Sequence, residues 1–212
     1  MFKSSKEKIN LIYDFAKKNL NDSTHDLAHS LRVIKNCLEI SKVEGGDNDI
    51  LIAAAFFHDI CNFAKNHPKR KLSSEYSAQK AEIFLIQINF DKQKIPIIKE
   101  AILCHSFSRN QKPQTLEGKI FQDADRLDSI GAVGICRAFM TGSSFGCNIY
   151  KPEDPFFKTN RNLDDKKYTT DHFYTKLFKL KDMMLTKTGK ILAEKRHKYM
   201  IKFLNRLESE IS

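Results

Sequence analysis

The segment that most constrains the fold is residues 47–60, DNDILIAAAFFHDI. It opens with residues that cap helices and then becomes apolar on every side. A helix without a polar face has to be surrounded by other elements, because any uncovered side would leave apolar surface in water. The segment therefore predicts a central helix inside a helical bundle.

The rest of the chain follows the same helical period. Apolar residues recur three and four positions apart, and Gly45 and Gly46 provide a helix stop after the second segment. We find no convincing alternating strand pattern and no internal repeat. We expect an all-α, single-domain helical bundle. The expected helical segments are residues 5–20, 25–45, 47–60, 73–88, 96–107, 115–140, 171–185 and 188–211.

A length of 212 residues suits one well-filled domain. We expect a single domain over residues 1–212, with a core at about 21–140, a long loop at 141–170 and C-terminal helices at 171–210. The loop is rich in Gly, Ser, Pro, Asn and Asp but also contains aromatic residues, which disordered linkers usually lack. This composition predicts an ordered loop that encloses part of the molecule or its substrate.

Composition narrows the class of protein. The chain is 41% hydrophobic and 29% charged, which is ordinary for a soluble protein. No apolar run is long enough to span a bilayer, and the N-terminal residues do not resemble a secretory signal. The five cysteines are scattered without a CxxC pair, as is typical of reduced thiols. We expect a cytoplasmic protein without a membrane partner, whose oligomeric state the sequence does not define.

The net charge of +10 admits anionic partners. The lysines are spread along the chain and are not interleaved with aromatic residues as in a strand-binding surface. Nucleic acid is therefore not the favoured partner. The charge also admits a small phosphorylated substrate, or it comes from lysines that are simply solvated on helix surfaces.

His58 and Asp59 interrupt the apolar run of residues 51–63. A buried carboxylate needs a cation, hydrogen bonds or a metal ion to compensate it. Two other segments, HDLAHSLRV and QDADRLDS, supply further candidates. These are His25, His29, Arg32, Asp123, Asp125 and Asp128. Imidazole and carboxylate ligands with open positions suit ions such as Mn²⁺, Fe²⁺ or Zn²⁺, and hydrolytic metal catalysis needs those open positions for water and substrate.

Taken as an ordered set, the motifs HDLAHSLRV, FFHDI, HSFS and QDADRLDSIGAVGI resemble the HD-domain superfamily of metal-dependent phosphohydrolases. The similarity to one single-domain bacterial branch continues through DHFYTKLFKLKDMMLTKTGK and KRHKYM. The resemblance implies one divalent metal ion, with Mn, Mg, Fe, Zn, Co and Ni as the candidates. The ligands that it implies are His29, His58, Asp59 and Asp125. It also implies hydrolysis of a phosphoester or phosphoanhydride bond, and relatives that are nucleoside triphosphate pyrophosphohydrolases make a nucleotide substrate plausible.

Further residues are candidates for catalysis and substrate binding. The catalytic candidates are Asp59, His105 and Asp128. The substrate-binding candidates are His25, Arg32, Lys65, Arg126 and His172. Alternatives stay open for three of these residues. His25 either has a structural role or touches water or substrate, and His105 either faces the scissile phosphate or supports a metal ligand. Asp128 either supports the site or pairs with Arg126.

The chain departs from better-known branches of the superfamily. Alarmone hydrolases carry HDxxED, whereas residues 58–63 read HDICNF, and no acidic residue follows Asp59 before Glu75. There is no HD-GYP pattern. Two other functions stay open: a di-iron HD-type oxygenase using extra ligands such as His105, and a non-catalytic module that binds a nucleotide or nucleic acid.

Overall fold

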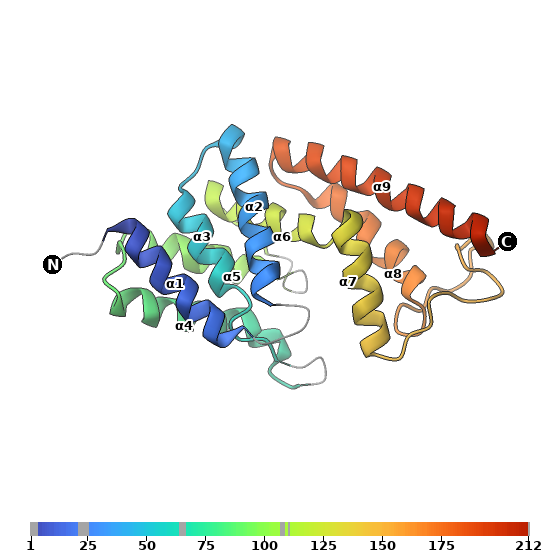
Figure 1. Ribbon diagram of the computed structural model, residues 1–212, viewed down its shortest axis with the longest axis horizontal. Helices are drawn as coiled ribbons and strands as arrows, with labels where there is room; N and C mark the ends of the chain where they lie inside the picture. Colours follow the sequence, from blue (N-terminus) through green and yellow to red (C-terminus); the bar gives the residue numbers. More distant parts are fainter. Residues whose placement is uncertain (1–3, 21–25, 64–66, 107–108, 110, 212) are drawn as a thin grey trace. The chain divides into compact units, whose positions relative to one another are not determined.

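The structure is a computed structural model that describes residues 4–20, 26–63, 67–106, 109 and 111–211 (Figure 1). Over these residues the regular elements are helical, which confirms the all-α prediction. The helices are α1 (Ser5–Asn19), α2 (Leu27–Glu44), α3 (Asn48–Phe57), α4 (Ser73–Gln87), α5 (Ile95–Cys104), α6 (Leu116–Asp128), α7 (Gly131–Ser144), α8 (Thr169–Thr175) and α9 (Lys187–Ile211). Short 3₁₀ helices cover Arg70–Leu72 and Leu177–Met183, and an isolated bridge joins Asn148 to Tyr168.

The chain divides into two compact units, Met1–Asp125 and Arg126–Ser212. The boundary falls inside α6, so one helix supplies residues to both units. No helix among the described residues is both long enough and apolar enough to cross a membrane.

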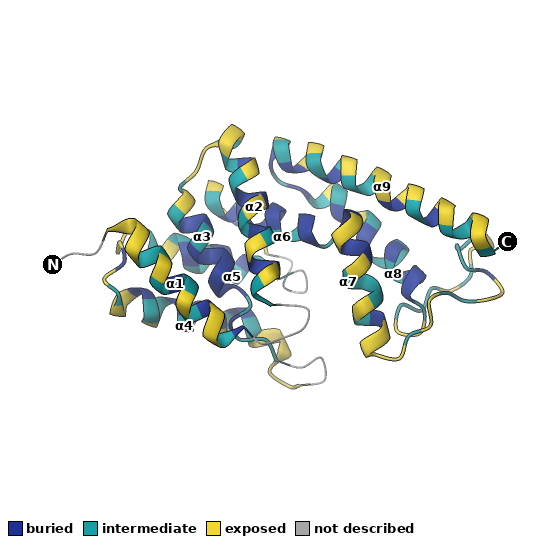
Figure 2. Ribbon diagram, in the orientation of Figure 1, coloured by how far each residue is buried: buried dark blue, intermediate teal, exposed yellow. Residues whose placement is uncertain are grey.

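Helix α3 forms the centre of the first unit. It contacts α1, α2, α4 and α5, and Figure 2 shows it buried along nearly its whole length. Its buried residues are Ile50, Leu51, Ala53, Ala54, Ala55, Phe56 and Phe57. The central alanines leave room for neighbouring helices to approach closely, while the flanking large side chains fill the spaces between them. This confirms the central helix that the apolar segment predicts.

Side-chain caps fix where the two helices before the site begin. The carboxylate of Asp26 accepts a hydrogen bond from the backbone N–H of His29 at 2.7 Å, which starts α2. Gly45 follows the last residue of α2 with φ of 85°, a conformation that glycine adopts without strain. Asp47 then caps α3 by accepting from the N–H of Asp49 at 2.8 Å.

The second unit combines α7, α8 and α9 with a long connection, residues 145–168. An aromatic cluster of Phe139, Phe173 and Phe203 packs between these helices. The connection is held in place by Arg161, whose Nη1 and Nη2 atoms lie 2.7 and 2.6 Å from the two carboxylate oxygens of the fully buried Asp171. Helix α7 runs to Ser144 and α8 begins at Thr169, so the irregular segment is shorter at both ends than the expected loop over residues 141–170.

Two boundaries differ from the sequence-based expectations. Helix α3 ends at Phe57, so His58 and Asp59 lie at the end of the apolar helix and in the following turn, not inside a helix. The expected single helix over residues 115–140 is two helices, α6 and α7, separated at Ser129 and Ile130. Gly131 has φ of 78°, a left-handed conformation that allows the chain to turn here.

Candidate metal centre

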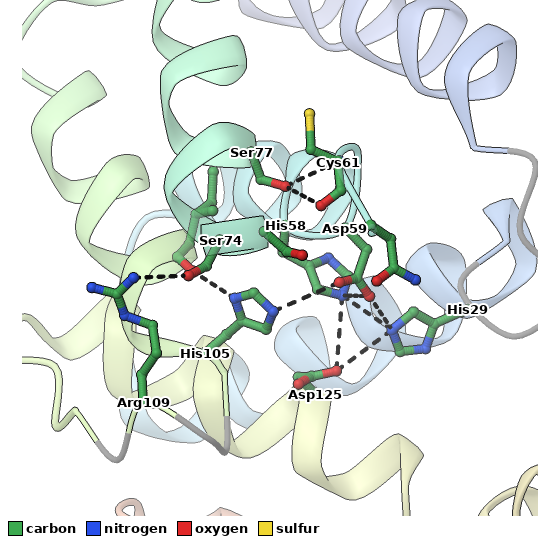
Figure 3. Close-up of polar contacts among 12 residues, drawn as sticks. His29, His58, Asp59, Cys61, Ser74, Ser77, His105, Arg109 and Asp125 are labelled. Atoms are coloured by element: carbon green, nitrogen blue, oxygen red, sulfur yellow. Dashed lines mark hydrogen bonds and ion pairs between the residues drawn. The ribbon is translucent and has the colours of Figure 1, made fainter. Parts of the chain in front are cut away.

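Three segments of the first unit bring four polar side chains together (Figure 3). The start of α2 supplies His29, the turn after α3 supplies His58 and Asp59, and α6 supplies Asp125. The imidazoles of His29 and His58 are each only 1% exposed, whereas both carboxylates are partly accessible. A solvent-borne ligand would therefore meet the carboxylates first, with the two imidazoles behind them.

The distances between the ligand atoms are short. The Nε2 atoms of His29 and His58 are 3.0 Å apart, and Asp59 Oδ2 lies 3.1 Å from His58 Nε2. Asp125 Oδ1 lies 3.5 Å from His29 Nε2 and 3.9 Å from His58 Nε2. His29, His58 and Asp125 form a cluster whose ligand atoms lie within 4.8 Å of one another, an arrangement that can hold a metal ion.

A backbone hydrogen bond fixes the tautomer of His58. Its Nδ1 lies 2.9 Å from the carbonyl oxygen of Ala55, so Nδ1–H donates to that oxygen. The lone pair of Nε2 is then directed at the cluster, as in metal-binding histidines, which commonly donate the other ring N–H to a carbonyl. Two Nε2 atoms 3.0 Å apart need a proton or a cation between them, because their lone pairs repel. The donor set therefore fits a divalent cation.

The electrostatics of the cluster favour a positive charge. Burial opposes protonation of His58, but the Asp59 and Asp125 carboxylates outweigh it and raise the pKa of His58 to about 9. Burial also opposes ionisation of Asp125. The hydrogen bond from His29 and the positive charge of the nearby imidazoles nevertheless hold the pKa of Asp125 well below its usual range. A bound cation would supply the same charge and displace protons from the ligands.

Asp125 is positioned through the backbone of α6. Asn36, a buried residue of α2, donates from Nδ2 to the carbonyl oxygen of Ala124 at 2.9 Å. This bond joins the helix that carries His29 to the residue directly before Asp125. A buried polar contact therefore joins α2 to α6 directly beside the cluster.

His105 lies beside the cluster at the end of α5. Its Nδ1 lies 2.6 Å from the carbonyl oxygen of Ile102, so this ring also directs Nε2 away from its own helix. That Nε2 is 3.7 Å from Asp59 Oδ1, and the ring meets His58 edge to face. The sequence nominated His105 as a candidate, and the structure places it next to Asp59.

The family model of the HD domain matches residues 26–130. The uncharacterized protein YpgQ of Bacillus subtilis (strain 168) is 36% identical to this chain over 193 residues, which cover 89% of this chain and 85% of YpgQ. The chain belongs to the HD-domain superfamily. The matched HD domain contains all four residues of the cluster.

Solved structures of similar proteins share this fold. An HD-superfamily hydrolase from Bacillus thuringiensis superposes with a TM-score of 0.76 at 32% identity, covering 98% of each chain. Bacillus subtilis YpgQ in complex with ADP superposes with a TM-score of 0.75 at 31% identity, covering 98% of this chain and 96% of YpgQ. This HD-domain protein therefore has the fold of HD-superfamily hydrolases.

The other predicted residues occupy different places. Arg32 lies on α2, one turn beyond His29, and is half-buried. His25 and Lys65 lie outside the described residues. The remaining three candidates, Arg126, Asp128 and His172, belong to the second unit, and their functional assignment stays a prediction. Arg126 donates to the Met183 carbonyl at 2.6 Å, and Asp128 accepts from Arg137 at 2.7 Å. The Nδ1 atom of His172 lies 3.1 Å from the Asp165 carboxylate.

Sequence reasoning missed several residues around this HD-domain site. Ser77 of α4 hydrogen-bonds both the N–H and the carbonyl of Cys61, at 3.1 and 3.4 Å, and so holds the turn after Asp59. Arg109 pairs with Glu75 and contacts Ser74 beside His105 (Figure 3). The only sequence signal for Arg109 is its place four residues after His105, which by itself does not indicate where the side chain goes.

Proposed function

We propose that this protein is a divalent-metal-dependent phosphohydrolase that cleaves a phosphoester or phosphoanhydride bond of a nucleotide. The observation that carries the proposal is the convergence of two buried imidazole Nε2 atoms, 3.0 Å apart, with the carboxylates of Asp59 and Asp125. The hydrolase fold supports the reaction class. The complex of YpgQ with ADP supports a nucleotide as the substrate.

In this proposal His29, His58, Asp59 and Asp125 hold one divalent cation. When bound, the cation supplies Lewis-acid chemistry, which makes water a stronger nucleophile and neutralises charge on the phosphoryl group. The Ala55 carbonyl keeps the proton of His58 on Nδ1, so Nε2 remains a ligand. Asp59 faces His58 with one carboxylate oxygen and His105 with the other.

His105 is our candidate for proton transfer. Its Nδ1–H donates to the Ile102 carbonyl, so its Nε2 is the acceptor nitrogen of the neutral ring. That nitrogen faces Asp59 Oδ1 and is placed to take a proton from the attacking water. This role replaces the acidic residue that the HDICNF segment lacks.

The proposal is tested by measuring phosphate and pyrophosphate release from a panel of nucleotides with Mn²⁺, Mg²⁺, Zn²⁺ or no metal. We expect metal-dependent turnover that falls more than about hundredfold in Asp59→Ala, with loss of bound metal measured by elemental analysis. Asp14→Ala is the matched control, because Asp14 is an exposed residue of α1.

Full activity with retained metal in Asp59→Ala would contradict the proposal. No turnover of any nucleotide by the metal-loaded protein would also contradict it. In that case an iron-dependent optical spectrum with oxygen consumption would favour the oxygenase, and nucleotide binding without turnover would favour a binding module.

A further inference from the structure

Arg109 lies in the first unit, on the side of His105 that is turned away from the candidate metal centre. Figure 3 shows the His105 ring between Asp59 on one side and the guanidinium of Arg109 on the other. The Nε2 atom of His105 is 3.7 Å from Asp59 Oδ1, so the three side chains form a row that leads outward from the cluster. The Arg109 guanidinium is the cation at the outer end of this row. It faces the part of a substrate that continues past a phosphate bound at the inner end, beside Asp59.

Two residues at the start of α4 hold the guanidinium. Arg109 Nη1 lies 2.6 Å from Glu75 Oε1 and 3.5 Å from the hydroxyl oxygen of the buried Ser74. Among the residues that the structure describes, Nε and Nη2 of Arg109 have no hydrogen-bond partner. The guanidinium is therefore fixed through one nitrogen while its other donors stay available.

The Glu75–Arg109 pair contributes little as a structural ion pair. The side chains are 40% and 21% exposed, and ion pairs in water-accessible positions add little to stability. A guanidinium oriented by a carboxylate is, however, suited to bidentate binding of a phosphate, because less side-chain freedom is lost when the phosphate arrives.

We propose that Arg109 binds a phosphate group of the substrate next to the phosphate that is attacked at the metal cluster, with Glu75 as its positioning residue. A phosphate monoester reaches only the cluster, whereas a polyphosphate chain extends past His105 to Arg109. A substrate that reaches both places carries at least two adjoining phosphates. This inference rests on the proposed function, because it uses the metal cluster as the place of attack.

The test compares Arg109→Gln and Arg109→Lys with wild type on ATP, ADP and the monoester p-nitrophenyl phosphate, each with Mn²⁺. In Arg109→Gln we expect KM for ATP and ADP to rise about 10- to 100-fold, because charge-assisted hydrogen bonds are lost. We expect kcat to stay within about threefold and the kinetics of the monoester to be unchanged. Arg109→Lys should lie between the two, since it keeps the charge without the planar fork.

The control is Arg206→Gln, which removes an exposed ion pair with Glu210 on α9 and should leave all constants unchanged. Thermal unfolding and Mn²⁺ affinity are measured for every variant, and neither should change in Arg109→Gln. If Arg109→Gln does not fold, Arg109→Lys and Glu75→Gln provide the test. We expect each of them to raise KM for ATP and ADP by a smaller factor and to leave KM for the monoester unchanged. Unchanged KM for ATP and ADP, or an equal rise for the monoester, overturns the assignment.

Equilibrium binding of ADP to the Mn²⁺-loaded protein separates this inference from the proposed function. If wild type binds ADP without hydrolysing any nucleotide, and Arg109→Gln binds it at least about tenfold more weakly, Arg109 keeps its role while the phosphohydrolase proposal fails. If wild type does not bind ADP, or if both proteins bind it equally, the role of Arg109 is overturned.

Discussion

The two histidines His58 and His105 show how a helix end can prepare a side chain for chemistry. Each follows the last residue of a helix, and each donates Nδ1–H to the carbonyl three residues earlier. Carbonyls in the last turn of a helix lack a backbone partner, so the imidazole satisfies one of them. The same bond fixes the tautomer and turns Nε2 towards Asp59. One local arrangement therefore serves both rings.

Asn36 of α2 makes a buried hydrogen bond next to Asp125, and we expect its removal to affect both stability and metal binding. Its Nδ2 donates to the Ala124 carbonyl in a buried position, next to Asp125. We expect Asn36→Ala to lower the free energy of unfolding by about 1–3 kcal/mol, because a buried hydrogen bond is lost. We also expect Mn²⁺ affinity to fall about 10- to 100-fold, because Asp125 loses its support.

Urea unfolding and calorimetric titration with Mn²⁺ measure these two effects. Asn10→Ala is the control, because Asn10 is exposed on α1. A destabilised Asn36→Ala protein with wild-type Mn²⁺ affinity would show that Asn36 supports packing alone and does not position Asp125.

At the scale of the elements, hydrophobic periodicity predicted the existence of the helices better than their ends. Helix α1 and helix α9 match their predicted segments closely. The period cannot distinguish one helix over residues 115–140 from two, because α6 and α7 have apolar residues at similar spacing. The break depends on the left-handed conformation of Gly131, which the sequence permits without requiring. Similarly, the apolar run predicted a helix that continues to residue 60, because apolar character alone does not show that α3 ends at Phe57.

The connection over residues 145–168 carries a prediction on pH. The Asp154 carboxylate accepts from the Thr159 hydroxyl at 2.6 Å, the Thr159 N–H at 3.0 Å and the Lys158 N–H at 2.8 Å. The Thr159 hydroxyl and these backbone groups, together with Arg161, lower the pKa of Asp154 to about 2. An unfolded chain has an Asp pKa of about 3.9, so ionised Asp154 stabilises the fold above about pH 4. That stability is lost as the pH falls towards 2.

We expect Asp154→Asn to unfold at a lower temperature than wild type between pH 5 and 7, with a difference that shrinks as the pH falls from about 4 to about 2. Thermal unfolding of both proteins across this pH range measures the effect. Glu153→Gln, at an exposed neighbouring position, is the control. A difference that stays constant down to pH 2 would show that the charge of Asp154 does not stabilise the connection.

At the scale of the whole molecule, the sequence could nominate the polar residues of the site but not assemble them. The resemblance of the His and Asp motifs to the HD-domain superfamily implied the four residues that the structure brings together. The contact between Arg109 and Glu75 joins residues that are 34 positions apart, and no local pattern predicts such a pairing. The helical period predicted one helix over residues 115–140 that carries both Asp125 and Asp128. It did not predict that α6 contributes to both units, with Asp128 beside Arg137 in the second.

All four proposed metal ligands fall within the first unit, so metal binding should stabilise the chain by linkage. At a free Mn²⁺ concentration of about 100 times Kd, binding adds about 2.7 kcal/mol to the free energy of unfolding. We therefore expect chelation of the metal to lower the unfolding temperature of wild type by about 5–11 °C for a chain of this size. Calorimetry with Mn²⁺ and with chelator measures the shift. Asp125→Asn should lose most of the shift, because it removes a charged ligand, while Asp14→Asn should keep it. An equal shift in Asp125→Asn and wild type would place the stabilising ion somewhere other than this cluster.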